Sequence, residues 1–171
     1  MKSIKTIISL ACLPALLTGC NTQPKMTSGV QAPLLQEERL VIHQLSPHKT
    51  GPNTAAAEID FTNKTGQSLS YVMFKTTAYD GNGNIVKAQK SGAPNAFLRL
   101  AGPIQDSKRS GVNRWNTVWA DSQVVCFRIE GAEVIFSDSS VEDYALDQIE
   151  MDLATLPPSV CHHDGQTVAS Q

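Results

Sequence analysis

The sequence predicts an all-β fold, an antiparallel β-sandwich, and the pattern of its central segments carries that prediction. Residues 56–62 (AAEIDFT) alternate, with Ala57, Ile59 and Phe61 on one face, which is the two-residue period of a half-buried strand. Residues 68–79 (SLSYVMFKTTAY) are rich in aromatic and β-branched residues, as strands are. Short segments of this kind recur at near-regular spacing with turn residues between them, which is typical of a sandwich.

The other elements follow in order along the chain. Further strands are expected at residues 39–45, 85–89, 95–100, 115–120, 123–129 and 132–137, the last two separated by a break at Gly131. Turns are predicted at residues 63–66 (NKTG) and 80–84 (DGNGN), because Asn, Asp and Gly adopt the backbone angles that turns need. Polar loops are expected at residues 46–53 and 102–114.

The C-terminal part of the chain shows a different spacing. Apolar residues fall at helical intervals at Val141, Tyr144, Ala145, Ile149 and Leu153. This spacing predicts a short helix within residues 141–154, with an edge strand over part of it as the alternative. Pro157-Pro158 would end that element, and residues 165–171 are expected to form a disordered tail.

The N-terminal residues have the features of a secretory signal. Lys2 and Lys5 precede an apolar stretch at residues 7–17, which is shorter than the twenty or so residues of a membrane-spanning helix. Leu17-Thr18-Gly19-Cys20 comes next, and these four residues resemble the lipobox of bacterial lipoproteins.

The resemblance implies cleavage before Cys20, which then becomes a lipidated N-terminus. Several acyl chains on one residue anchor a protein stably, whereas one chain holds only marginally. Residue 21 is Asn, where Asp favours inner-membrane retention of enteric lipoproteins, so the resemblance implies the outer membrane, at its periplasmic face or the cell surface. The alternative is an ordinary secretory signal followed by a chance cysteine.

On this interpretation the chain has four parts. They are a signal peptide (1–19), a lipidated cysteine with a flexible tether (20–38), a single β-sandwich domain (39–164) and a tail (165–171). The formal net charge is −2, and it becomes −4 once Lys2 and Lys5 leave with the signal. Because there is no basic excess, nucleic acid is not expected as a partner.

Two cysteines remain in the mature chain, Cys126 and Cys161. Secretion would place them in an oxidising compartment, where a disulfide is expected. Such a bond would close a loop of about 35 residues and stabilise the fold by roughly 3–4 kcal/mol in the chain-entropy model. The alternative is a buried thiol at Cys126 and a free thiol at Cys161.

Residues 55–138 resemble small bacterial envelope domains with an immunoglobulin-like sandwich. The shared outline is a strand, the turn NKTG, a strand with an aromatic pair, the hairpin DGNGN, and the segment NTVWADSQVVCFRI, in which a Trp-containing loop leads into a strand with a cysteine. The resemblance implies an immunoglobulin-like form of the sandwich. It brings no catalytic residue, so it implies a fold without an activity.

The segment Cys161-His162-His163-Asp164 has side chains that suit zinc or copper, and His43 and His48 could complete a site if the fold delivered them. Neighbouring residues on an extended chain point in opposite directions, so a disulfide cysteine followed by solvated polar residues is the favoured interpretation.

Asp80, Asn82 and Asn84 match the first positions of a calcium loop. The match fails where Ile85 replaces the required glycine and Ser91 the bidentate glutamate, so a hairpin turn is favoured. No metal and no cofactor are expected.

A partner-binding loop is considered at Lys108, Arg109, Arg114, Trp115 and Trp119. Trp and Arg dominate binding hot spots, and a rigid sandwich often presents a binding loop. The alternatives are core packing for the two tryptophans and a solvated basic loop for the cations.

No nucleophile elbow, phosphate-binding loop or recognisable Ser/His/Asp arrangement is found in the sequence, so catalysis is not expected. The sequence therefore predicts a membrane-anchored, non-enzymatic interaction or structural module, whose partner is another envelope protein. The alternative is a periplasmic lipoprotein that binds a soluble ligand or a metal.

Overall fold

The computed structural model describes residues 38–156 and Cys161. The strands are β1 (Leu40–Gly51), β2 (Thr54–Asn63), β3 (Leu69–Asp80), β4 (Ile85–Val86), β5 (Asn95–Ile104), β6 (Asn113–Trp119), β7 (Val124–Phe136), β8 (Val141–Ala145) and β9 (Ile149–Met151), with one 3-10 turn, η1 (Leu146–Gln148), before β9. The predicted signal peptide, Cys20, almost all of the tether and the tail lie outside the described residues. Within the described part, no helix is long and apolar enough to cross a membrane.

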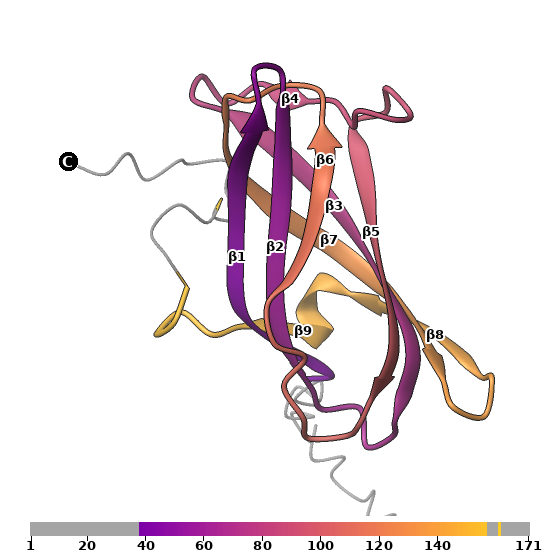
Figure 1. The fold of residues 1–171 in the computed structure, drawn as a ribbon. Coiled ribbons are helices and arrows are strands. Elements are labelled where there is room, and N and C mark those ends of the chain that lie inside the picture. The colour runs from indigo at the N-terminus through magenta and orange to yellow at the C-terminus, as the bar shows by residue number, and fades with distance from the viewer. Residues whose placement is uncertain (1–37, 157–160, 162–171) are drawn as a thin grey trace, which may run out of the picture. The chain divides into compact units, whose positions relative to one another are not determined.

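Two sheets face each other across a common core, which confirms the predicted all-β sandwich (Figure 1). Sheet A has the strand order β6-β2-β1-β9, and sheet B has the order β4-β3-β7-β8 with β5 also paired to β3. Neighbouring strands are antiparallel except β1 and β9, which pair in parallel. The strands β5 and β6 are consecutive in sequence but belong to different sheets, and each lies at the edge of its own sheet.

The core forms because each strand turns its alternate apolar side chains inward. Ala57, Ile59 and Phe61 of β2 are fully buried, as their alternation predicts. Phe61 meets Phe74 of sheet B edge-to-face, with ring centroids 5.2 Å apart, so an aromatic pair joins the two sheets at the centre. The predicted turn at residues 63–66 is confirmed, and Asn63 holds it by accepting from the backbone N–H and hydroxyl of Thr65.

Several predicted boundaries are wrong. The strand expected at residues 85–89 ends at Val86, and the loop expected at residues 102–114 is shorter because β5 continues to Ile104 and β6 begins at Asn113. The expected loop at residues 46–53 is mostly strand, because β1 continues to Gly51 and pairs with β2 up to Thr54. Val124–Phe136 form one long strand, β7, without the break expected at Gly131. The chain absorbs the irregularity there as a register shift against β3, and a Cβ on Gly131 would lie 2.9 Å from the Tyr144 carbonyl oxygen.

The short helix expected within residues 141–154 is also wrong; β8, the η1 turn and β9 occupy most of that segment. The helical spacing of its apolar residues arises because the segment crosses from one sheet to the other, and two of these residues are buried in different sheets. Tyr144 is buried on β8 in sheet B, and Ile149 is buried on β9 in sheet A. The alternative of an edge strand is confirmed by β8, which pairs only with β7.

The disulfide between Cys126 and Cys161 is present, with Cα atoms 5.4 Å apart. Cys126 is buried on β7, so the bond fixes the end of the described chain to sheet B. The closed loop contains most of β7 and all of β8, η1 and β9, and thereby one partner of the only parallel strand pair among the described residues.

Candidate functional site: a groove between β5 and β6

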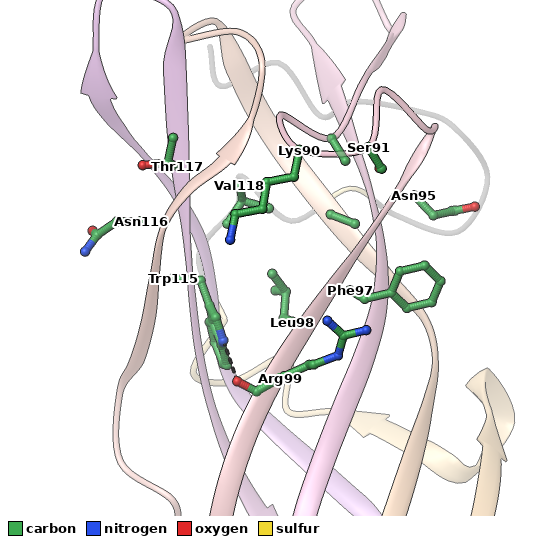
Figure 2. A pocket seen from close by; sticks show the side chains of 12 residues that line it. Lys90, Ser91, Asn95, Phe97, Leu98, Arg99, Trp115, Asn116, Thr117 and Val118 are labelled. Carbon is green, nitrogen blue, oxygen red and sulfur yellow. Dashed lines mark hydrogen bonds between the residues drawn. The ribbon is translucent and has the colours of Figure 1, made fainter.

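A cavity of about 300 Å³ opens where the edge of sheet A meets the edge of sheet B (Figure 2). Its walls are β5, β6 and the turn that follows β4. The lining residues are Ala88, Lys90, Ser91, Asn95, Ala96, Phe97, Leu98, Arg99, Trp115, Asn116, Thr117 and Val118. We call this region the β5–β6 groove.

The floor of the groove is apolar. Leu98 and Ala96 are buried on β5, and Val118 and Trp115 are half-buried on β6. Because β5 alternates, Leu98 faces the groove, whereas its neighbours Phe97 and Arg99 are exposed on the outer surface of sheet B. An apolar floor with a few polar groups at the rim is the common composition of ligand sites.

One hydrogen bond crosses the groove. The indole Nε1 of Trp115 donates to the main-chain carbonyl of Arg99 at 2.8 Å, as the dashed line in Figure 2 shows. The Trp115 side chain therefore connects the two sheets at an end of the groove where their backbones are not paired. Its half-buried ring also forms part of the wall.

Two cations border the groove without a counter-ion. Within the part of the chain that the structure describes, neither the Lys90 nor the Arg99 side chain has a hydrogen bond or an ion pair, and no acidic residue lines the cavity. Figure 2 shows Lys90 extending from its turn into the space between the strands. The groove therefore combines an apolar floor with an uncompensated positive charge.

The turn that carries Lys90 is fixed to the end of β6. Gln89 N–H donates to the Val118 carbonyl at 2.8 Å, and Ala120 N–H donates to the Lys87 carbonyl at 3.0 Å. The turn itself is closed by a bond from Gly92 N–H to the Ala88 carbonyl at 2.9 Å. Lys90 thus projects from a backbone that is held in place.

Thr117 lies in the groove wall with a left-handed backbone, φ +62°. This conformation is uncommon for a β-branched residue and costs on the order of 1–3 kcal/mol. It accompanies a β-bulge between β2 and β6. Ala55 and Ala57, two residues apart on β2, pair with Trp119 and Trp115, which are four residues apart on β6. The bulge lies beside the cavity, and such features concentrate at functional sites.

The structure separates the five residues considered for a partner-binding loop. Arg109 pairs with the buried Asp60 at 2.8 Å, and Arg114 pairs with Glu58 at 3.2 Å, so both cations are committed to carboxylates of β2. Lys108 is exposed in the segment between β5 and β6. Only Trp115 of the five lines the groove.

Trp119 is fully buried and packs on Phe127, with ring centroids 4.8 Å apart. The core-packing alternative is therefore confirmed for this tryptophan.

The metal site considered at residues 161–164 lacks a thiolate ligand, because Cys161 forms the disulfide. His162, His163 and Asp164 lie outside the described residues. His48 contacts Glu58, with 2.8 Å between Nε2 and the carboxylate oxygen. Across the described residues, no group of three or more His, Cys, Asp or Glu side chains is arranged to hold a metal ion.

The residues considered for a calcium loop form a closed turn. Asp80 accepts from the backbone N–H groups of Asn82 and Asn84 and from the Asn84 side-chain amide, at 2.8–3.0 Å. These bonds, led by that of the Asn84 side chain, lower the pKa of the Asp80 carboxyl below its usual value. The Asp80 carboxylate therefore stabilises the hairpin turn in which it lies, as the turn interpretation predicts.

A chain of polar side chains on sheet A was not expected from the sequence. His43 Nδ1 donates to the Asp152 carboxylate at 3.0 Å, and its Nε2 lies 2.7 Å from the Thr62 hydroxyl. The His43 bond lowers the pKa of the Asp152 carboxyl. Thr155 also donates to the His43 carbonyl, so the network joins β1, β2 and the segment after β9. These polar side chains therefore bond to one another and stabilise the fold. Since 109 residues separate His43 from Asp152, no local signal could have shown it.

Comparison with known proteins adds little. No family model matches the chain, and a search of the curated proteins finds no match. Among solved structures, IrmA from Escherichia coli is similar with a TM-score of 0.49 and 11% identity, over 68% of this chain and 93% of that chain. A likeness of this size assigns neither a ligand nor a partner.

Proposed function

We propose that this protein is an outer-membrane lipoprotein whose immunoglobulin-like sandwich is a non-enzymatic binding module for another envelope protein. The observation that carries the binding role is the β5–β6 groove, where Lys90 and Arg99 lie beside an apolar floor and have no counter-ion in the part of the chain that the structure describes. Desolvated aromatic and apolar surface with a few charged groups is what partner sites offer.

The anchoring part of the proposal rests on the lipobox-like residues Leu17-Thr18-Gly19-Cys20. A lipid anchor confines the module to two dimensions and so raises its effective concentration near membrane partners. The disulfide supports a location where thiols are oxidised.

The anchor is tested by Cys20→Ser in the native host. We expect this variant to be released from the membrane fraction and to lack the mass of the acyl chains at its N-terminus. If the variant stays with the membrane, the anchoring part is wrong.

The binding role is tested by photo-crosslinkers placed singly on the full-length protein in its own envelope. Phe97, 49% exposed beside the groove, is the test position, and Val141, 56% exposed on β8, is the matched control. A protein adduct is expected from position 97 and not from 141. Equal or absent adducts at both positions in folded protein would contradict the groove as the contact surface.

A soluble ligand is the second candidate. The cavity of about 300 Å³ lies at the lower end of the range for small-molecule sites. In that case position 97 gives no protein adduct, and a small molecule co-purifies with the protein and is displaced by filling the groove with Leu98→Trp.

A further inference from the structure

We propose that the β5–β6 groove binds an extended, acidic polypeptide segment, which adds as a strand to the free edge of β5. This inference rests on the proposed binding role and names the chemical class of the partner. A strand that adds to a sheet edge gains affinity from main-chain hydrogen bonds and specificity from its alternate side chains.

The backbone of β5 has the required orientation. The Ala96 carbonyl accepts from the Thr76 hydroxyl of β3, whereas the Arg99 carbonyl accepts from Trp115 of β6. Alternate residues of an antiparallel strand turn their N–H and C=O to opposite sides. Asn95 and Phe97 therefore present their main-chain groups to the open edge, on the same side as the Arg99 carbonyl.

That edge is unpaired in the structure. β5 pairs with β3 alone, and no main-chain hydrogen bond joins β5 to β6 within residues 38–156. An exposed strand edge is a template for another chain unless it is covered. The Trp115 indole occupies the Arg99 carbonyl and so marks one end of the free stretch.

The side chains select the occupant. A strand beside β5 would turn alternate residues to the floor around Leu98 and Val118, where apolar side chains fit. Its other residues would lie level with Phe97 and Arg99 on the outer surface. Arg99 lies on that outer surface and Lys90 reaches into the space between the strands, and neither has a counter-ion among the described residues, so carboxylates of an added strand match both cations in charge.

The experiment measures binding of a defined probe, the fluorescent peptide acetyl-Gly-Glu-Val-Glu-Val-Glu-Val-Glu-Gly-amide, to the mature full-length protein in detergent. Saturable binding is expected at low salt, weakening as salt screens the charges. Lys90→Ala with Arg99→Ala should weaken it about tenfold, since exposed charge pairs contribute up to about 1 kcal/mol each. The control, Lys49→Ala with Lys108→Ala, removes two exposed cations elsewhere and should leave binding unchanged.

Strand addition is separated from simple charge attraction by two further peptides, one N-methylated at the central valine and one at the glutamate that follows it. Each keeps every charge but lacks one main-chain donor. Because alternate N–H groups of a strand point to opposite edges, one of the two should bind at least tenfold more weakly, whichever way the added strand runs. The parent peptide should also slow hydrogen exchange at the Asn95 and Phe97 amides. Binding of both methylated peptides equal to that of the parent, or full displacement by millimolar glutamate, would overturn strand addition in favour of a small-anion site.

The two proposals can fail separately. If the peptide does not bind while a crosslinker at position 97 captures a specific envelope protein, the binding module stands and the acidic-strand inference is wrong. If both fail in folded protein, the proposed function falls with the inference.

Discussion

The Trp115 indole donates to the Arg99 carbonyl across the interval between sheet A and sheet B, at 2.8 Å. Edge strands of a sandwich usually leave such an interval to solvent or to a partner. Here a single side chain limits the groove at one end and leaves the rest of β5 open. The length of free edge that a partner could pair with is thus set by one tryptophan.

Trp115→Phe removes this hydrogen bond but keeps an aromatic ring in the wall. We expect a loss of about 1 kcal/mol in the free energy of unfolding, because an exposed neutral hydrogen bond contributes about that much. Urea denaturation measures it. The variant also frees the Arg99 carbonyl, so the acidic peptide should bind as well as to the wild type or better. Abolished peptide binding in a folded variant would show that the indole itself contacts the ligand.

Thr117→Gly should stabilise the fold by about 1 kcal/mol. Glycine adopts the left-handed conformation without strain, although it adds conformational freedom to the unfolded chain. The change in thermal unfolding midpoint checks this result. A destabilised variant would mean that the Thr117 side chain contributes more through its contacts than its backbone conformation costs.

Arg109→Ala should lower the free energy of unfolding by about 2 kcal/mol. Asp60 is buried, and removing its guanidinium partner leaves a carboxylate with only a long contact to Ser110, at 3.5 Å. Lys108→Ala, one residue earlier and exposed, is the matched control and should change stability by less than about 0.5 kcal/mol. Equal effects of the two substitutions would contradict a structural role for Arg109.

The contact between His43 and Asp152 predicts a pH dependence. The pKa of Asp152 is lower in the folded state than its unfolded value of about 3.9. Its contribution to stability is therefore present above pH 3.9 and is lost as the pH falls through the lower, folded value. Asp152→Asn should remove this part of the acid dependence. Urea midpoints between pH 2 and 7 provide the test, and parallel curves for variant and wild type would argue against the contact.

Removal of the disulfide by Cys126→Ala with Cys161→Ala should cost about 3 kcal/mol in the free energy of unfolding, since the bond closes a loop of 35 residues. The wild-type mass under non-reducing conditions should be two hydrogens lower than after reduction. An unchanged mass would show free thiols in the isolated protein.

The fold was predictable where local pattern and burial coincide. Phe61 alternates with polar neighbours and lies in the core, and the residues from Asn63 to Gly66 form the expected turn. The segment from residue 141 to 154 misled because Tyr144 and Ile149 bury in separate sheets, which no single helical or strand period describes.

The site was less accessible to prediction. The sequence offers Trp115 as a partner-binding candidate beside a basic loop, with core packing as the alternative, whereas Lys90 and Arg99 give no signal because a charged residue in a loop or on an exposed strand face is common. Their significance depends on which edges the two sheets leave open, and therefore on long-range pairing. The exposed positions of Phe97 and Arg99 in an alternating strand are the nearest sequence clue to that surface.

The parallel pairing of β1 with β9 has a consequence for the order of folding. Leu40 lies opposite Ile149, so the outer neighbour of the first strand is supplied by the last one. β1 and β2 are adjacent in sequence and can pair as a hairpin, whereas the other edge of β1 is covered only once the chain as far as Met151 is in place. A chain that ended before β9 would leave that edge of β1 unpaired and open to another strand.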